Sequence, residues 1–176
     1  MSDELEFRDD LSGLYNRRYF GQTLPRLLKE AQTARRPLSL VVIDIDFFKT
    51  INDTYGHACG DRVIREFGEF LLRTVKKSDI VCRYGGDEFV CILPRTDYGQ
   101  SLRVSQRIIE ESHQREFGRL KITLSIGIAT YPDHGDDGLT LFESADQDLY
   151  SAKRHGRDQV GLHSEREPGL LIPTPE

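Results

Sequence analysis

Residues 83–89 read Arg83-Tyr84-Gly85-Gly86-Asp87-Glu88-Phe89 and join two apolar runs, Ile80 to Tyr84 and Phe89 to Leu93. Apolar runs on either side of a glycine pair are typical of a β-hairpin. We expect the two glycines to adopt backbone angles that other residues avoid and to let a bulky ligand approach the main chain. The two carboxylates supply hard oxygen ligands, so this turn could hold a metal-bound triphosphate.

The composition is that of one soluble domain with a substantial core. The chain has 176 residues, of which 38% are hydrophobic and 30% are charged. A net charge of -5 argues against nucleic acid as a partner. Cys59, Cys82 and Cys91 lack metal-site spacing, and we assign them to packing. Without a signal peptide or a long apolar span, a cytoplasmic location and no insertion into a membrane are expected.

The hydrophobic pattern outside the hairpin predicts a buried strand from Leu38 to Asp46, covered on both faces. We predict a loop at 56–60, a strand at 120–131 interrupted near Gly127, and a short edge strand at 159–162. Predicted helices cover residues 16–36, 47–55, 61–76, 102–117 and 139–155. This alternation describes an α/β protein, more closely an α+β sandwich. The proline-rich tail, 163–176, is expected to be disordered.

Asp44 and Asp46 are two residues apart at the end of the predicted central strand. Their side chains therefore point to the same face, where a cation could be held. The alternative is that these carboxylates cap the helix that follows at Phe47. If the hairpin pairs beside this strand, Asp87 converges on the same place, and a divalent ion would make the crowded negative charges tolerable.

Asn52 and Asp61 flank the predicted loop. An amide and a carboxylate together could read a base, and Asp61 facing the N1 and N2 donors of guanine would favour guanine over adenine. The alternative is that Asn52 makes a turn and Asp61 caps the next helix. His57 is most simply a residue that packs in the loop.

Lys153 and Arg157 are four residues apart, so they share a helical face if the last helix continues, and they could grip β- and γ-phosphates. The alternative is a favourable interaction of both side chains with the dipole of the helix C-terminus. Lys49, close to Asp46, is a further candidate phosphate contact.

Four motifs in this order resemble one family. The first is Asp9-Asp10-Leu11-Ser12-Gly13-Leu14-Tyr15-Asn16-Arg17-Arg18-Tyr19-Phe20, and the second is Asp44-x-Asp-x-Phe-Lys-x-x-Asn-Asp-x-x-Gly-His-x-x-Gly-Asp61. The third is Gly85-Gly-Asp-Glu-Phe89, and the last is Tyr150-x-Ala-Lys153-x-x-Gly-Arg157. The chain closely resembles the GGDEF domain of diguanylate cyclases over about residues 9 to 162.

The resemblance implies a mostly antiparallel sheet flanked by helices, similar to nucleotidyl cyclase and polymerase palm domains. It also implies an enzyme that condenses two GTP molecules into cyclic di-GMP, a bacterial second messenger, and two pyrophosphates. Each protomer would hold one GTP, so catalysis would need a homodimer with facing sites. Two Mg²⁺ or Mn²⁺ ions in each site would assist attack of a 3′-hydroxyl on an α-phosphate.

The resemblance assigns roles to residues as follows. The metal would be held by Asp44, Asp87 and Glu88 with the Ile45 carbonyl, and these three carboxylates with Lys49 form the catalytic group. GTP would be bound by Phe47, Phe48, Asn52, His57, Asp61, Gly85, Gly86, Lys153 and Arg157.

Two departures from the family pattern stand out. Its product-inhibition site, Arg-x-x-Asp, reads Lys76-x-x-Asp79 here. Lysine lacks the planar paired donors of arginine, so inhibition should be weakened, with Arg107 supporting residual binding. Residues 1–8 form a shorter lead than the sensor or coiled-coil segment usual in the family, which suggests an excised catalytic domain or a short member.

Three other functions are compatible with the same motifs. One is a catalytically silent module that binds GTP or cyclic di-GMP and controls a partner. Another is a related enzyme that makes a mixed or adenine-containing cyclic dinucleotide. The last is a polymerase palm, which the acidic charge disfavours.

Overall fold

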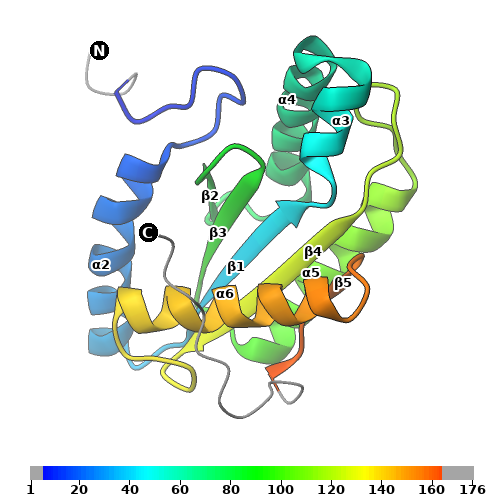
Figure 1. Ribbon diagram of the computed structural model, residues 1–176. Coiled ribbons are helices and arrows are strands. Elements are labelled where there is room, and N and C mark those ends of the chain that lie inside the picture. The colour runs from blue at the N-terminus through cyan, green and yellow to red at the C-terminus, as the bar shows by residue number, and fades with distance from the viewer. Residues whose placement is uncertain (1–5, 164–176) are drawn as a thin grey trace, which may run out of the picture.

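A five-stranded mixed sheet forms the centre of the fold, with the strands in the order β2-β3-β1-β4-β5 (Figure 1). The computed structural model describes residues 6–163. The strands are β1 (Leu38–Ile45), β2 (Ile80–Arg83), β3 (Glu88–Pro94), β4 (Leu124–Tyr131) and β5 (Gln159–Val160). The helices are α2 (Arg17–Ala34), α3 (Phe48–Tyr55), α4 (His57–Thr74), α5 (Tyr98–His113) and α6 (Gly138–Arg154).

Strand β1 is the central strand, as its apolar run predicts. It pairs antiparallel with β3 on one side and with β4 on the other, and all eight of its residues are buried. The predicted hairpin is also confirmed, because β2 and β3 pair antiparallel around the glycine turn. The exception to antiparallel pairing is β5, which lies parallel to β4 at the edge.

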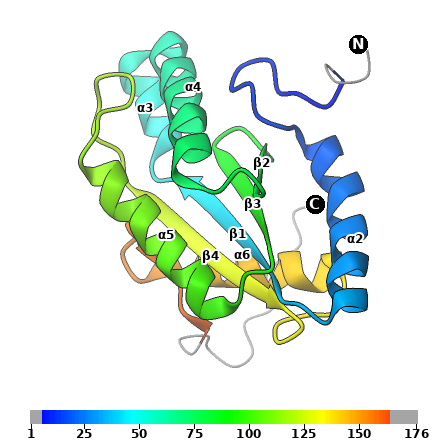
Figure 2. The ribbon, with the colours of Figure 1, turned by 180° about the vertical axis from the view of Figure 1, so that it is seen from behind.

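Helices cover both faces of the sheet. In Figure 1, α6 crosses in front of the strands and α2 stands beside them, and Figure 2 shows α4 and α5 on the opposite face. Alternate residues of β1 feed two separate cores: Val41 and Ile43 pack with the α4 and α5 side, whereas Leu40 and Val42 pack with the α2 and α6 side. The predicted α+β sandwich is therefore confirmed.

Close backbone contact holds α6 against the sheet. A Cβ atom on Gly127 of β4 would lie 1.9 Å from the carbonyl oxygen of Ala145, and one on Gly161 would lie 1.7 Å from that of Asp148. The predicted interruption of the strand near Gly127 is wrong, since β4 runs unbroken and Gly127 pairs with Val42. This glycine lets a helix approach the strand rather than breaking it.

Two predicted helices begin four residues earlier in the structure, and the one predicted to end at residue 117 ends at His113. The loop expected at 56–60 is wrong because α4 already begins at His57, after a sharp turn at Gly56 with φ of 88°. Helix α5 begins at Tyr98 rather than Leu102, because Asp97 and Gln100 form a capping box that starts it early.

The ends of the chain lie partly outside the described residues. The residues outside the description are 1–5 of the predicted lead and 164–176 of the tail that is expected to be disordered. The domain limits at 9 and 162 stay predictions. Arg8 forms an isolated bridge with Tyr15. Across residues 6–163, none of the helices combines the length and apolar character needed to cross a membrane.

Candidate functional site

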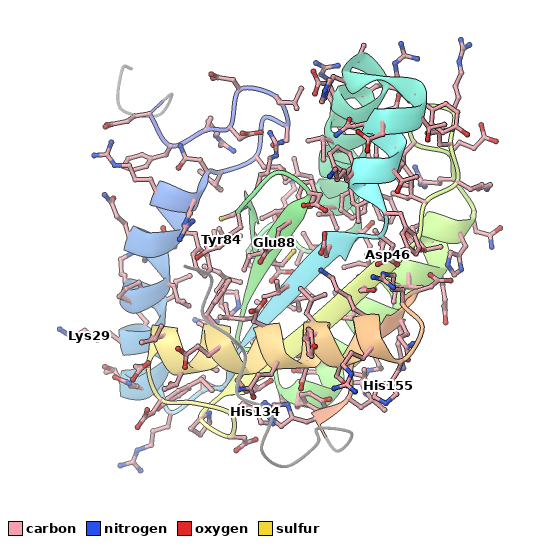
Figure 3. All side chains as sticks on the ribbon, in the orientation of Figure 1. Lys29, Asp46, Tyr84, Glu88, His134 and His155 are labelled. Carbon is pink, nitrogen blue, oxygen red and sulfur yellow. The ribbon has the colours of Figure 1, made fainter. Side chains whose placement is uncertain are left out.

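Carboxylates from two strands meet at one end of the sheet. Asp44 of β1 lies directly opposite Glu88 of β3 in the register, so both side chains emerge on the same face. The Ile45 amide donates to the Asp87 carbonyl at 3.2 Å, which brings the hairpin turn beside the end of β1. Figure 3 shows Glu88 and Asp46 at this same end. The convergence predicted for the hairpin and the central strand is confirmed.

Asp44 is buried in this cluster and forms an ion pair with Lys153 through Oδ2. Burial and a hydrogen bond shared with the Asp87 carboxyl raise the pKa of Asp44 to about 7, although Lys153 opposes the rise. Two carboxyls share a hydrogen bond only when one is protonated. When both are ionised, Asp44 Oδ1 is a buried acceptor without a donor.

Glu88 and Asp146 extend the negative charge toward α6. Burial raises the pKa of Glu88, and the nearby Asp146 raises it further while Lys153 opposes the rise. Burial also raises the pKa of Asp146. Asp146 was not predicted from the sequence, although its position seven residues, or two helical turns, before Lys153 places both on one face of α6.

This donor set suits a divalent cation that is also bound by substrate. Among residues 6–163, no cluster of three or more His, Cys, Asp or Glu side chains is arranged to hold a metal ion alone. Mg²⁺ commonly takes one or two carboxylates and completes its coordination with water and phosphate oxygens. The unpaired Asp44 oxygen and the crowded carboxyls fit such a shared site.

The glycine turn is shaped by Arg83 rather than by unusual glycine angles. Neither Gly85 nor Gly86 has a positive φ, so the conformational reason we predicted for them is wrong. Space above Gly86 is open, with nothing within 4 Å of a Cβ placed there, so a ligand could lie against it. Arg83 donates to the Gly86 carbonyl at 2.8 and 3.2 Å and forms an ion pair with Asp9.

Asn52 and Asp61 lie on a helix pair, α3 and α4, not on either side of a loop. The half-buried Asn52 turns toward α4, where a Cβ on Gly60 would lie 1.8 Å from its Oδ1. Asp61 is exposed and stands five residues into α4, whose N-cap is Gly56. The alternative roles, a turn for Asn52 and a cap for Asp61, are therefore wrong. His57 is the exposed first residue of α4.

The start of α3 separates two adjacent phenylalanines. Phe47, its N-cap, has φ of 56° and is 62% exposed, an uncommon combination for a bulky side chain. The ring of Phe48 instead packs toward the core of α4 and the sheet. Lys49 is exposed on the first turn. No side chain caps α3, so the alternative capping role of Asp44 or Asp46 is wrong.

Lys153 and Arg157 do not share a helical face, because the last helix does not continue as far as Arg157. Helix α6 ends at Arg154, and Gly156, Arg157 and Asp158 have φ of 108°, 63° and 50°. Arg157 turns toward α3, and its guanidinium carbon lies 4.7 Å from the centre of the Phe47 ring. The two cations reach the site from different directions, one beside Asp44 and the other above Phe47.

The residues of the predicted inhibitory site lie near the end of α4. The Lys76 amide donates to Asp79 Oδ2 at 2.9 Å, and burial raises the pKa of Asp79 against the effects of Lys76 and Arg107. Arg107 donates to the Thr74 carbonyl at 2.7 Å and so satisfies a terminal carbonyl of α4. Its electrostatic effect on Asp79 places the two side chains in one neighbourhood.

Comparisons with known proteins agree on one family. Residues 6–159 match the family model described as diguanylate cyclase, GGDEF domain. The chain is 44% identical to the response regulator PleD of Caulobacter vibrioides over 89% of this chain and 36% of that protein. It is 38% identical to the diguanylate cyclase DosC of Escherichia coli over 88% of this chain and 34% of that protein. It thus spans about a third of these relatives.

A solved structure gives the same picture. The GGDEF domain of DgcB from Caulobacter crescentus, in complex with cyclic di-GMP, superposes with a TM-score of 0.82 at 34% identity. The match covers 90% of this chain and 96% of that one.

Proposed function

Because the chain belongs to the diguanylate cyclase GGDEF-domain family, we propose that it condenses two GTP molecules into cyclic di-GMP and two pyrophosphates. The observation that carries the proposal is the pairing of Asp44 with Glu88 beside Asp87, with a buried, unpaired Asp44 oxygen and Lys153 at the same point. The 3′-hydroxyl of one GTP would attack the α-phosphate of the other.

The carboxylates would hold Mg²⁺ or Mn²⁺, two ions per site. Asp44, Asp87 and Glu88 would be the side-chain ligands, with the Ile45 carbonyl as a further oxygen. Bound there, such ions would lower the pKa of the attacking hydroxyl and neutralise the departing pyrophosphate. Because Lys153 pairs with Asp44, its ammonium group is placed to meet the same phosphate oxygens.

The helix pair α3 and α4 would read the base. Asp61 is exposed and free to accept two hydrogen bonds from the N1 and N2 donors of guanine, and Asn52 stands beside it on the facing helix. His57 lies at the start of the same surface. Adenine offers no such donor pair, so we infer a preference for GTP over ATP.

Other residues would bind the triphosphate and form the surface against which the nucleotide lies. Arg157 above Phe47, together with Lys49 on the first turn of α3, supplies positive charge at the start of that helix. Phe48 would contribute through its backbone, because its ring packs inward. Gly85 and the open surface over Gly86 would let the nucleotide lie against the hairpin.

Catalysis requires two copies of the chain. Each GTP must supply a nucleophile and also accept attack, so two sites have to face each other in a two-fold arrangement. A homodimer follows, in which each protomer binds one GTP. Initial rates should therefore rise faster than linearly with protein concentration across the range in which the dimer forms.

Feedback by the product is proposed to be weak. Lys76 replaces the arginine of the family motif, and a single ammonium cannot match the paired acceptors of a guanine edge or a phosphate. We expect a loss of about ten-fold or more in affinity for cyclic di-GMP at this site. Arg107 would support what binding persists, with Asp79 as the acidic partner.

Chromatography of products from purified protein, GTP and Mg²⁺ tests the proposed reaction. We expect cyclic di-GMP from the wild type and none from Asp87→Ala, with unchanged far-UV circular dichroism in the variant. A dimer that binds GTP but yields no product would make the chain a silent binding module instead. Equal turnover of ATP in a competition assay would contradict the role of Asp61.

A further inference from the structure

Asp46 differs from Asp44 in that both of its carboxylate oxygens are already used. It is 5% exposed, and its Oδ1 accepts a hydrogen bond from Ser125 Oγ at 2.7 Å. Its Oδ2 accepts from Thr123 Oγ1 at 2.7 Å and from the backbone amide of Asp158 at 3.1 Å. A carboxylate with this set of donors is satisfied by the protein and has little to gain from a metal ion.

The amide of Asp158 belongs to a turn that the chain does not favour by itself. Gly156, Arg157 and Asp158 follow α6 with three successive positive φ angles, and two of these residues carry side chains. Left-handed backbone is unfavourable for such residues and persists where surrounding bonds hold it. Several bonds do so here: the Arg157 amide donates to the Ala152 carbonyl at 2.9 Å, the Asp158 amide donates to Asp46, and the Gln159 side chain donates to the Arg157 carbonyl at 3.0 Å.

The turn held in this way presents Arg157 to the site. Two consecutive residues after β1 contact two consecutive residues after α6: Asp46 bonds to Asp158, and the ring of Phe47 lies under Arg157. His113 of α5 pairs with the Asp158 carboxylate at 2.7 Å on the outer side. Figure 3 shows Asp46 between the tip of β1 and the turn that follows α6.

We propose that Asp46 is a positioning residue, which fixes the turn after α6 and thereby aims Arg157 at the β- and γ-phosphates of the nucleotide. The inference rests on the proposed function in taking a guanine nucleoside triphosphate as the ligand and Arg157 as one of its phosphate contacts. Asp44 and Asp46, two residues apart, thus have different roles: Asp44 faces the proposed metal site, and Asp46 holds the turn that carries Arg157.

Binding measurements on the full chain separate this role from a general loss of structure. Calorimetry with Mg²⁺ would compare GMP with a GTP analogue that carries a methylene group between its α- and β-phosphorus atoms, so that no pyrophosphate can leave. We expect Asp46→Ala to weaken the analogue about ten-fold or more, the range for one charge-assisted contact, and to leave GMP within about three-fold. Equal weakening of both ligands overturns the proposal.

Matched variants identify the bond that matters. Ser125→Ala removes a donor to the other carboxylate oxygen without touching the turn, so the ratio of the two affinities should stay unchanged. Asp46→Asn keeps a carbonyl that can accept from Asp158 and should retain the affinity for the analogue. If Asp46→Ala does not fold, Asp46→Ser serves, because it keeps a hydroxyl while removing the carboxylate oxygen that accepts from Asp158.

A double-mutant cycle with Arg157→Ala gives the strictest test. If Asp46 acts through Arg157, Asp46→Ala in the Arg157→Ala background changes the affinity for the analogue less than about two-fold. Additive losses overturn the proposal, as does an Asp46→Asn variant that loses the Mg²⁺ dependence of binding, since that would make Asp46 a metal ligand. If the chain binds the analogue but makes no cyclic product, the proposed reaction is contradicted, and these binding comparisons still decide the role of Asp46.

Discussion

Replacement of Asp44 by asparagine should stabilise the metal-free protein at neutral and alkaline pH. Burial and the neighbouring Asp87 raise the pKa of Asp44 from its usual 3.8 to about 7, even with Lys153 opposing the rise. The protonated form is thus favoured in the folded state. Its stabilising effect is complete below the usual value and is lost as the pH rises through about 7, because folding must then accommodate an ionised carboxylate.

The size of the effect follows from the two pKa values. The difference between 3.8 and about 7 corresponds to about 4 kcal/mol of unfolding free energy above pH 7. The free energy of unfolding of the wild type should therefore be lower than that of Asp44→Asn by about 2 to 4 kcal/mol at about pH 8. Near pH 4 it should be lower by no more than about 1 kcal/mol. The gap should widen steadily between these limits.

Urea denaturation in the presence of a chelator measures the gap directly. Unfolding curves for the wild type and Asp44→Asn would be recorded at several pH values with equal slopes required for the comparison. Addition of Mg²⁺ should then stabilise the wild type more than the variant, because one of the proposed ligands is gone. A difference in unfolding free energy between the two proteins that stays constant across this pH range would refute the reasoning about the crowded carboxyls.

Two further substitutions test how the site is built. Gly127→Ala should cost about 3 kcal/mol or more of stability, since its Cβ would lie 1.9 Å from a backbone oxygen of α6. The control Gly21→Ala, with open space around its Cβ in α2, should be neutral or slightly stabilising. Thermal unfolding checks both variants. Arg83→Ala should lower turnover and cost about 2 kcal/mol, because the Gly86 carbonyl and the Asp9 carboxylate both lose their charged donor. Unchanged turnover in a folded Arg83→Ala variant would mean that the turn keeps its shape without that side chain.

The hydrophobic pattern was sufficient to predict the strands, and the meeting of their acidic ends followed on the condition that the hairpin pairs beside the central strand. A long β-branched run ending in carboxylates, followed later by a glycine turn between two apolar runs, constrains which strands can pair, because each needs a buried partner. Asp44, Asp87 and Glu88 could be brought together from that pairing alone. Asp44 and Glu88 lie on regular strands, where the spacing of side chains is fixed, and Asp87 directly precedes β3.

The errors fall where contacts distant in sequence decide the outcome. Gly127 looked like an interruption because its role, the close approach of α6, depends on a helix that follows it in the chain. A shared face for Lys153 and Arg157 depended on the helix continuing, but α6 ends at Arg154 and Gly156, Arg157 and Asp158 have positive φ. Asp146 and Arg83 carry no motif signal of their own in one sequence, and their importance comes from the carboxylates and the carbonyl that folding brings beside them.

Asp44 and Asp46 show most clearly what one sequence can and cannot separate. Period-two geometry correctly places both carboxylates on one face, but their partners differ because β1 ends between them. Asp44 lies within the strand, opposite Glu88 of β3, and is left with a buried oxygen that has no donor. Asp46 lies just beyond it, where two hydroxyls and a backbone amide reach it. The free-energy cost of the first carboxylate marks it for ligand binding, whereas the second, fully bonded, is suited to hold the protein around that ligand.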